Sequence, residues 1–394
     1  MGLATPDPSQ SLPSYFIAAL QDRHFAMTHE NHIFAKFTGN EIFLEQGRLL
    51  FSLLHVFASA GYEITLFDNL ADKELDKYGQ LVYGLPGIQL ADGPTGDAEG
   101  DLYLYDSPDR CIAKRPWRKK VQVRFDMFAP FWFSDPLIMP FPMHPLQADT
   151  SPEKLQACRS RQRTLRLFFS GDTLHYGREW VRYPKPKMPR LPIINAVIED
   201  MGADVLIVNQ PAAFAKLGCD GYINKCVLAG SSDIRIAPES WLDAVAAADF
   251  FLSPPGIVMP MCHNIIEAMA VGTIPVTNYP EWLDPHLRHM EHCIVFDDRT
   301  DLMAKLDLVL QLDDAAIARL RANVIDYYQT HLRPEAFVRR VEAHQDRAFS
   351  ILMYTERNVA KKASRLGKGS LLMQGTTTPR PARGLGRMAA SLLG

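Results

Sequence analysis

Several features that assign a chain to a common class of protein are missing from this sequence. It has no run of 18 or more consecutive apolar residues, and its opening stretch MGLATPDPSQSLPSY has neither the basic start nor the apolar middle of a signal peptide. We therefore expect a cytoplasmic protein. The six cysteines form no CxxC pair and have no zinc-like spacing, which predicts reduced thiols and no structural metal. Neither a GxGxxG nor a GxxxxGK[ST] pattern occurs, and this argues against a dehydrogenase or a kinase.

The formal net charge of -3 is unevenly distributed along the 394 residues. Residues 355–394 carry eight Lys or Arg and one acid, so the preceding 354 residues carry about -10. This basic stretch is rich in Gly, Ser, Thr and Pro, which favours a flexible tail, and contact with an anionic membrane surface is the alternative. The acidic body and the lack of aromatic residues in the tail disfavour nucleic acid as a partner.

Short apolar segments alternate with helical ones in both halves of the chain, which predicts an α/β fold with parallel sheets covered on both faces. The strand candidates are HIFAKFT (32–38), YEITLF, DLYLY and VQVRF, then TLRLFF, DVLIVN, DFFLS, GTIPVT and CIVF. Because the series occurs twice, we expect two doubly wound, Rossmann-like domains facing a cleft. Five prolines in residues 136–152 indicate an interdomain crossing. The predicted divisions are 1–145, 146–354 and the tail 355–394.

Ligands of such sheets bind beyond the carboxyl ends of the strands, so the loops that follow strands are the places to search. Four loops fit this description: Gly39-Asn40, Ser170-Gly171-Asp172, Asn209-Gln210-Pro211 and Pro254-Pro255-Gly256. The last loop leads into PPGIVMPMCHNIIEAMAVGTIPV (254–276), which holds a charged Glu267 in an apolar run.

Two interpretations of Glu267 follow from the residues alone. In the first, Asn264 is the N-cap of a helix, Glu267 completes a capping box, and Gly272 ends the helix. In the second, free N–H groups near His263, Asn264 and Ile265 bind a phosphate, while the Glu267 carboxylate accepts hydrogen bonds from a ribose diol.

The stretches AVAAADFFLSPPG and HNIIEAMAVGTIPVT, with the later YPEWLDPH, CIVFDD and TDLMAKLDLVL, resemble the nucleotide-sugar site of GT-B glycosyltransferases. The similarity is greatest to bacterial retaining transferases and exostosin-like proteins, and it covers residues 240–297. It implies that Glu267 binds the ribose of a nucleotide-sugar donor and that the start of its helix binds the diphosphate. Many retaining members have a second glutamate eight positions earlier, where this chain has Met259.

A leaving diphosphate requires positive charge, which a metal or basic side chains can supply. No DxD follows a strand candidate in the second half, so we expect a metal-independent enzyme without a cofactor. Cation candidates lie in HYGREWVRYPKPKMPR (175–190), with Arg178 favoured, and at Lys225. Gly256, Gly171 and Asp172 complete the expected donor site, because a glycine lets the backbone approach a ligand closely.

An inverting reaction needs a general base from the first domain, where the acceptor is expected. Asp106 follows DLYLY, Asp126 follows VQVRF, and His144 lies in the crossing, so these three are the candidates. We expect a glycosyltransferase whose partners are a nucleotide-sugar donor and a carbohydrate or lipid-linked acceptor. A sugar-nucleotide epimerase or hydrolase, or an inert nucleotide-sugar-binding protein, remains the alternative.

Overall fold

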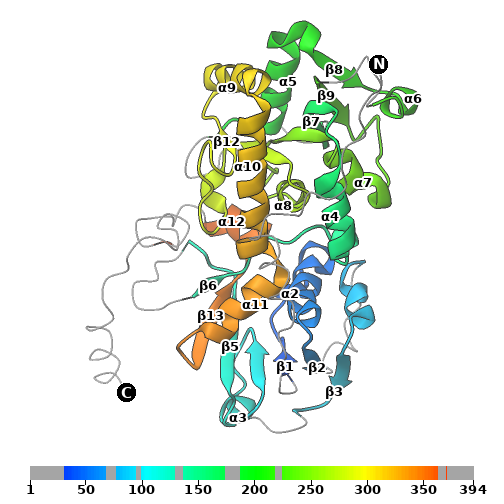
Figure 1. Ribbon diagram of the computed structural model, residues 1–394. Helices are drawn as coiled ribbons and strands as arrows, with labels where there is room; N and C mark the ends of the chain where they lie inside the picture. The colour runs from blue at the N-terminus through cyan, green and yellow to red at the C-terminus, as the bar shows by residue number, and fades with distance from the viewer. Residues whose placement is uncertain are drawn as a thin grey trace.

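The computed structural model describes residues 31–67, 77–94, 99–128, 136–173, 187–217, 224–362 and Ser370. Figure 1 shows two lobes, one above the other, each built around a sheet with helices packed against it. Within the described residues, no helix is both long enough and apolar enough to cross a bilayer.

The lower lobe is a seven-stranded sheet with the order β3-β2-β1-β4-β5-β13-β6, in which every pairing is parallel. Its strands are β1 (His32–Lys36), β2 (Glu63–Phe67), β3 (Ile88–Ala91), β4 (Leu102–Tyr105), β5 (Lys119–Arg124), β6 (Leu137–Ile138) and β13 (Ala348–Leu352). Its helices are α2 (Arg48–Ser59), α3 (Arg110–Ala113) and α11 (Pro334–Ala343). The largely apolar helix α2 is buried along most of its length, and it packs against α11.

The upper lobe is a six-stranded parallel sheet with the order β12-β11-β10-β7-β9-β8. Its strands are β7 (Leu165–Gly171), β8 (Val205–Val208), β9 (Lys225–Gly230), β10 (Ala248–Ser253), β11 (Ile274–Thr277) and β12 (Ile294–Val295). Its helices are α4 (Pro152–Ser160), α5 (Arg190–Asp200), α6 (Pro211–Phe214), α7 (Pro238–Val245), α8 (His263–Ala270), α9 (Arg299–Gln311) and α10 (Asp314–Tyr327). Every residue of β10 is buried, as a central parallel strand requires.

The predicted α/β class with two doubly wound domains is confirmed, and every strand candidate from the sequence corresponds to a strand. Four strands lie outside those candidates: β3, β6, β9 and β13. The crossing 136–152 also contains the two-residue strand β6 and a short 3-10 turn, η4 (Pro145–Gln147).

The chain returns to the first domain after the second one, which corrects the division that assigned 146–354 to a single domain. Strand β13 pairs with β5 on one side and with β6 on the other, so it belongs to the lower sheet. Its Ile351 is fully buried in the core of the lower lobe, and this burial favours the pairing. In Figure 1 the orange α11 and β13 lie in the lower lobe with the blue and cyan elements.

The predicted tail also begins later than residue 355. A further helix, α12 (Glu356–Lys362), follows β13, and Asn358 and Val359 of this helix are buried. Residues 371–394, on which most of the flexible-tail and membrane-contact predictions rest, lie outside the described residues.

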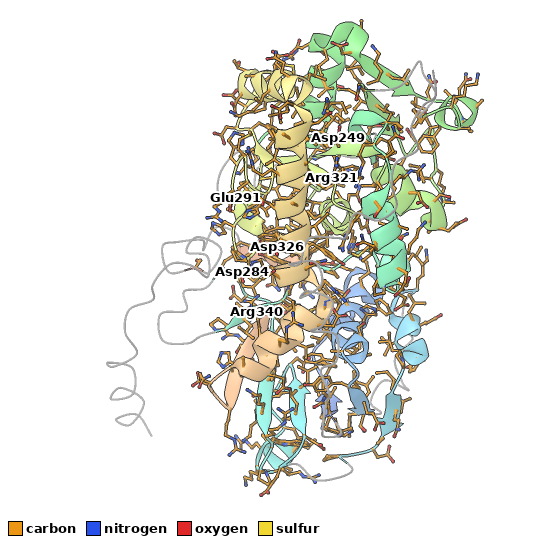
Figure 2. The ribbon with its side chains drawn as sticks, in the orientation of Figure 1. Asp249, Asp284, Glu291, Arg321, Asp326 and Arg340 are labelled. Carbon is orange, nitrogen blue, oxygen red and sulfur yellow. The ribbon has the colours of Figure 1, made fainter. Side chains whose placement is uncertain are left out.

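The carboxyl edges of the two sheets face each other. Trp282, which follows β11, packs against Phe128, which follows β5, with ring centroids 6.2 Å apart, and against Tyr354, which follows β13, at 5.6 Å. Arg340 of α11 forms an ion pair with the buried Asp284 of the upper domain at 3.1 Å, and Figure 2 shows both residues where the lobes meet. Side chains that follow strands in either domain therefore lie near the interdomain boundary.

Candidate functional site

Helix α8 begins at the carboxyl edge of the upper sheet, beside the end of β10. A cavity of about 200 Å³, its open part included, lies at this point, and we call it the α8 cavity. Its lining residues are Phe169, Arg190, Phe251, Ser253, Pro254, Cys262, Asn264, Ile265 and Tyr279. The first N–H groups of a helix have no partner within the helix and point toward its start, so this cavity is suited to a negatively charged group.

Two side chains add to the polar character of the α8 cavity. The hydroxyl of Ser253, a residue only 2% exposed, has no hydrogen-bond partner among the described residues. Arg190, the first residue of α5, is 6% exposed, and its guanidinium donates to the Asp172 carbonyl and to Cys262 Sγ, both at 3.3 Å. A buried cation and an unsatisfied hydroxyl together form a site that an anion with several acceptor oxygens would fill.

The glycines expected at the donor site have local structural roles. A Cβ atom on Gly171 would lie 3.2 Å from the Phe169 ring and 3.5 Å from Arg190 Nη1, so the space beside Gly171 is occupied by the guanidinium. At Gly256 a Cβ atom would lie 2.5 Å from the Met259 carbonyl, because the Gly256 N–H closes a tight turn onto the Pro260 carbonyl. Asp172 takes part through its backbone carbonyl, which accepts from Arg190.

Of the two basic residues named from the sequence, Lys225 lies away from this site. Lys225 is the first residue of β9, at the amino edge of the sheet, and its ammonium lies 3.7 Å from Asp204 and 3.2 Å from the Ala203 carbonyl. The expectation for Lys225 is wrong, because the amino edge of a parallel sheet is opposite its ligand-binding edge. Arg178 lies outside the described residues.

A second cavity, of about 350 Å³ with its open part included, lies between the domains, and we call it the interdomain cavity. Its lining residues are Glu45, Arg48, Leu49, Ser52, Met139, Pro140, Phe141, Pro142, His263, Met353 and Tyr354. Glu45 has a left-handed backbone with φ of 58°, and its carboxylate accepts a hydrogen bond from the Glu356 N–H at 2.8 Å. Burial raises the pKa of Glu45 above its ordinary value.

His263 lines the interdomain cavity, and its neighbours Cys262 and Asn264 line the α8 cavity. The hydrogen-bond partners of His263 define its tautomer. Nδ1 lies 2.8 Å from the Pro142 carbonyl, which can only accept, so Nδ1 carries the hydrogen. Nε2 lies 3.1 Å from Nη1 of Arg48, which can only donate, so Nε2 is unprotonated. Burial lowers the pKa of His263 to about 3, so the imidazole is neutral at physiological pH.

Glu267 lies in the second turn of α8 and is 2% exposed. Its Oε1 accepts a hydrogen bond from the His144 backbone N–H at 2.9 Å, and its Oε2 accepts one from the Trp241 indole N–H at 2.5 Å. Burial raises the pKa of Glu267 to about 7, although these two hydrogen bonds lower it in part. The carboxylate therefore connects the interdomain crossing to α7 and α8.

The capping-box interpretation of Glu267 is wrong. The N-cap of α8 is Cys262, and no side chain caps the helix start. Asn264 lies inside the helix and donates through Nδ2 to the Ser170 carbonyl at 3.2 Å, which holds α8 against the end of β7. Gly272 follows the end of the helix with φ of 75°, as the sequence predicted. Ile265 is fully buried and lines the α8 cavity.

The three candidate bases lie in different surroundings. Asp106 accepts hydrogen bonds from the N–H groups of Thr38 and Gly39, at 3.0 and 2.6 Å, so its carboxylate holds the loop after β1. Asp126 follows β5, two residues after its end, on the edge that faces the upper domain. His144 Nε2 lies 3.1 Å from the Tyr78 hydroxyl and Nδ1 accepts from the Leu146 N–H at 3.2 Å, while burial lowers the pKa of this imidazole. A catalytic role for any of the three stays a prediction.

In the sequence Arg190 lies in a basic segment but was not selected as a site residue, and Ser253, Trp241 and Arg48 were not identified. Contacts made in the folded chain single out Arg190, Trp241 and Arg48. Ser253 is the last residue of a strand candidate, and that position is the one signal that could have identified it.

Two doubly wound domains whose carboxyl edges face each other are the architecture that the GT-B resemblance implied. No family model matches the chain, and no curated protein matches it.

Three solved structures illustrate what the chain is similar to. The N-terminal domain of Candida albicans trehalose-6-phosphate phosphatase is 12% identical, over 81% of this chain and 98% of that chain, with a TM-score of 0.41. An α-glucosyltransferase in complex with UDP and DNA is 14% identical over 79% and 98% of the two chains, with a TM-score of 0.39. Anabaena HepE in complex with UDP and glucose is 12% identical over 80% and 100%, with a TM-score of 0.38. At such low similarity, the chain's own residues must define its site.

The raised pKa of Glu267 predicts a pH-dependent stability. Between its ordinary value of 4.5 and about 7, the unfolded chain releases the proton that the folded chain retains, so stability falls as pH rises. The loss is at most about 3 kcal/mol, and Glu267→Gln should abolish it. Urea unfolding at pH 5, 6, 7 and 8 measures the difference in unfolding free energy between wild type and variant, in which the opposite effect of His263 cancels.

Glu199→Gln is a matched control, because the Glu199 side chain is 58% exposed and its partner Arg299 lies at the surface. The difference in unfolding free energy between Glu199→Gln and wild type should not vary from pH 5 to pH 8. If the difference for Glu267→Gln is also independent of pH, the Glu267 carboxyl of the folded protein titrates at its ordinary pKa.

Proposed function

We propose that the protein is a glycosyltransferase that binds a nucleotide-sugar donor at the start of α8. The observation that carries this proposal is the α8 cavity, where the buried Arg190 guanidinium, the Ser253 hydroxyl and the helix start converge at the carboxyl edge of a parallel sheet. A diphosphate has the charge and the acceptor oxygens that such a site requires.

Each part of the donor has a proposed partner. The N–H groups at the start of α8, near His263, Asn264 and Ile265, bind the diphosphate together with Arg190. Glu267, one turn further along α8, accepts hydrogen bonds from the ribose diol. The sugar then projects toward the interdomain cavity, which Glu45 and Arg48 of the first domain line.

Charge on the departing nucleoside diphosphate is stabilised by Arg190 and the positive end of α8, which supports a metal-independent transfer. The acceptor, a carbohydrate or lipid-linked hydroxyl, approaches from the first domain. Met259 has no carboxylate, and it is 3% exposed and packed in the upper core. This position therefore cannot supply a carboxylate to the transferred sugar.

Substitution of Arg190 tests the donor site. Arg190→Gln should weaken the binding of the preferred nucleoside diphosphate by about 10- to 100-fold, the usual worth of hydrogen bonds to a charged group. Arg190→Lys keeps the charge but lacks the paired N–H donors of the guanidinium, so we expect a smaller loss of nucleotide affinity. Calorimetric titration with UDP, GDP, ADP, CMP and dTDP identifies the nucleotide and measures the change.

Arg299→Gln is the control, because the Arg299 side chain is half exposed and pairs with Glu199 and Asp200 away from the α8 cavity. It should bind the nucleotide like wild type. If Arg190→Gln also binds like wild type while remaining folded in urea melts, the diphosphate does not lie in the α8 cavity.

Turnover distinguishes a transferase from its alternatives. We expect sugar transfer from a labelled nucleotide sugar only when a glycan or lipid-linked acceptor extract is present, at a rate that excess EDTA does not change. Release or epimerisation of the sugar without an acceptor would indicate a hydrolase or epimerase. Tight binding without turnover would indicate an inert binding protein, and loss in EDTA with rescue by Mg²⁺ or Mn²⁺ would contradict metal independence.

A further inference from the structure

A short turn of the interdomain crossing covers Glu267. It consists of His144 and the 3-10 turn η4 (Pro145–Gln147), and we call it the 144–147 turn. The His144 N–H donates to Glu267 Oε1 at 2.9 Å, and Gln147 Nε2 donates to the Pro238 carbonyl at the start of α7 at 2.6 Å. These hydrogen bonds attach the turn to α8 and α7 of the upper domain.

No ligand can reach Glu267 while this turn is in place. The residue is 2% exposed, and neither the α8 cavity nor the interdomain cavity includes it in its lining. Trp241 covers the second carboxylate oxygen through its indole N–H. A ribose hydroxyl therefore needs one of these two covers to move before it can donate to the carboxylate.

The 144–147 turn is the cover that has a fixed entry and an exposed residue. Just before it, Phe141 and Met143 are buried in the upper core, and Met143 Sδ accepts a hydrogen bond from the Tyr328 hydroxyl at 3.4 Å. Within the turn, Leu146 is 49% exposed. A rotation of the turn about residues 141–143 would break its two hydrogen bonds to the upper domain and the one between the His144 imidazole and the Tyr78 hydroxyl, and it would expose Glu267.

We propose that the 144–147 turn is a lid over the ribose site of the donor. The lid deepens the proposed function and rests on it, because its opening matters only if a nucleotide binds here. When the lid opens, water takes over the His144 N–H, and the two ribose hydroxyls donate to the carboxylate that this N–H has left. The apparent nucleotide affinity then equals the affinity of the open form multiplied by the fraction of molecules whose lid is open.

The backbone of His144 allows a direct test of the lid. Its φ of -56° and ψ of 142° are those of a proline, so His144→Pro fits the local conformation while it removes the N–H that Glu267 accepts. His144→Ala keeps that N–H and removes only the imidazole. The difference in affinity between the two variants therefore reports the hydrogen bond that closes the lid.

The measurement is calorimetric titration of UDP, GDP, ADP, CMP and dTDP into the full-length wild type, His144→Pro and His144→Ala. His144→Pro should bind the preferred nucleotide at least about tenfold more tightly than His144→Ala, because a hydrogen bond to a charged group no longer holds the lid closed. Gln147→Ala, which loses the bond to Pro238 but leaves Glu267 untouched, should also bind more tightly than wild type. If His144→Pro does not fold, Gln147→Ala still tests the lid.

The results distinguish a failure of the lid proposal from a failure of the proposed donor site. Tighter binding by both lid variants supports the lid. If wild type binds measurably and the folded His144→Pro and Gln147→Ala variants bind no more tightly than wild type, the lid proposal is wrong and the donor-site proposal is unaffected. Absence of binding by wild type and by every folded variant would overturn the donor site and the lid together. Gln156→Ala, at an exposed position of α4, is the control and should bind like wild type.

Discussion

One buried carboxylate holds the interdomain crossing against the upper domain. Glu267 has been removed from water almost completely, so its oxygens must find donors within the protein. The His144 N–H and the Trp241 indole are those donors, and they come from the crossing and from α7. The position of the 144–147 turn therefore depends on a side chain of α8.

Preceding residues of the crossing set the geometry around the start of α8. The rings of Phe141 and His263 pack at a tilt with centroids 5.0 Å apart, and the Pro142 carbonyl sets the tautomer of that imidazole. The neutral His263 can then accept from Arg48 of the first domain. A contact between domains, a cavity and the start of α8 are thus arranged by a chain of directional hydrogen bonds rather than by apolar packing alone.

The sequence predicted the repeated sheet architecture because buried parallel strands read as short apolar runs, as in DFFLS and TLRLFF. It could not predict where β13 pairs, because strands that are neighbours in a sheet can lie more than 200 residues apart along the chain. The prediction for Lys225 failed because the segment that this residue begins, Lys225–Gly230, was not recognised as a strand, so the edge on which Lys225 lies was unknown. The importance of Glu267 was visible in its apolar surroundings, but its partners His144 and Trp241 come from distant segments that only the fold brings together.

The proposed donor site needs positive charge together with exclusion of water, and both occur where Arg190 and Ser253 meet the start of α8. In this proposal a nucleotide binds there and displaces the 144–147 turn from Glu267. Hydrogen–deuterium exchange of the full-length protein, with and without the tightest-binding nucleoside diphosphate, tests it most directly. The nucleotide should slow exchange at the start of α8 and speed exchange of the amides of residues 144, 146 and 147. Slower or unchanged exchange in residues 144–147, together with protection at the start of α8, would contradict it.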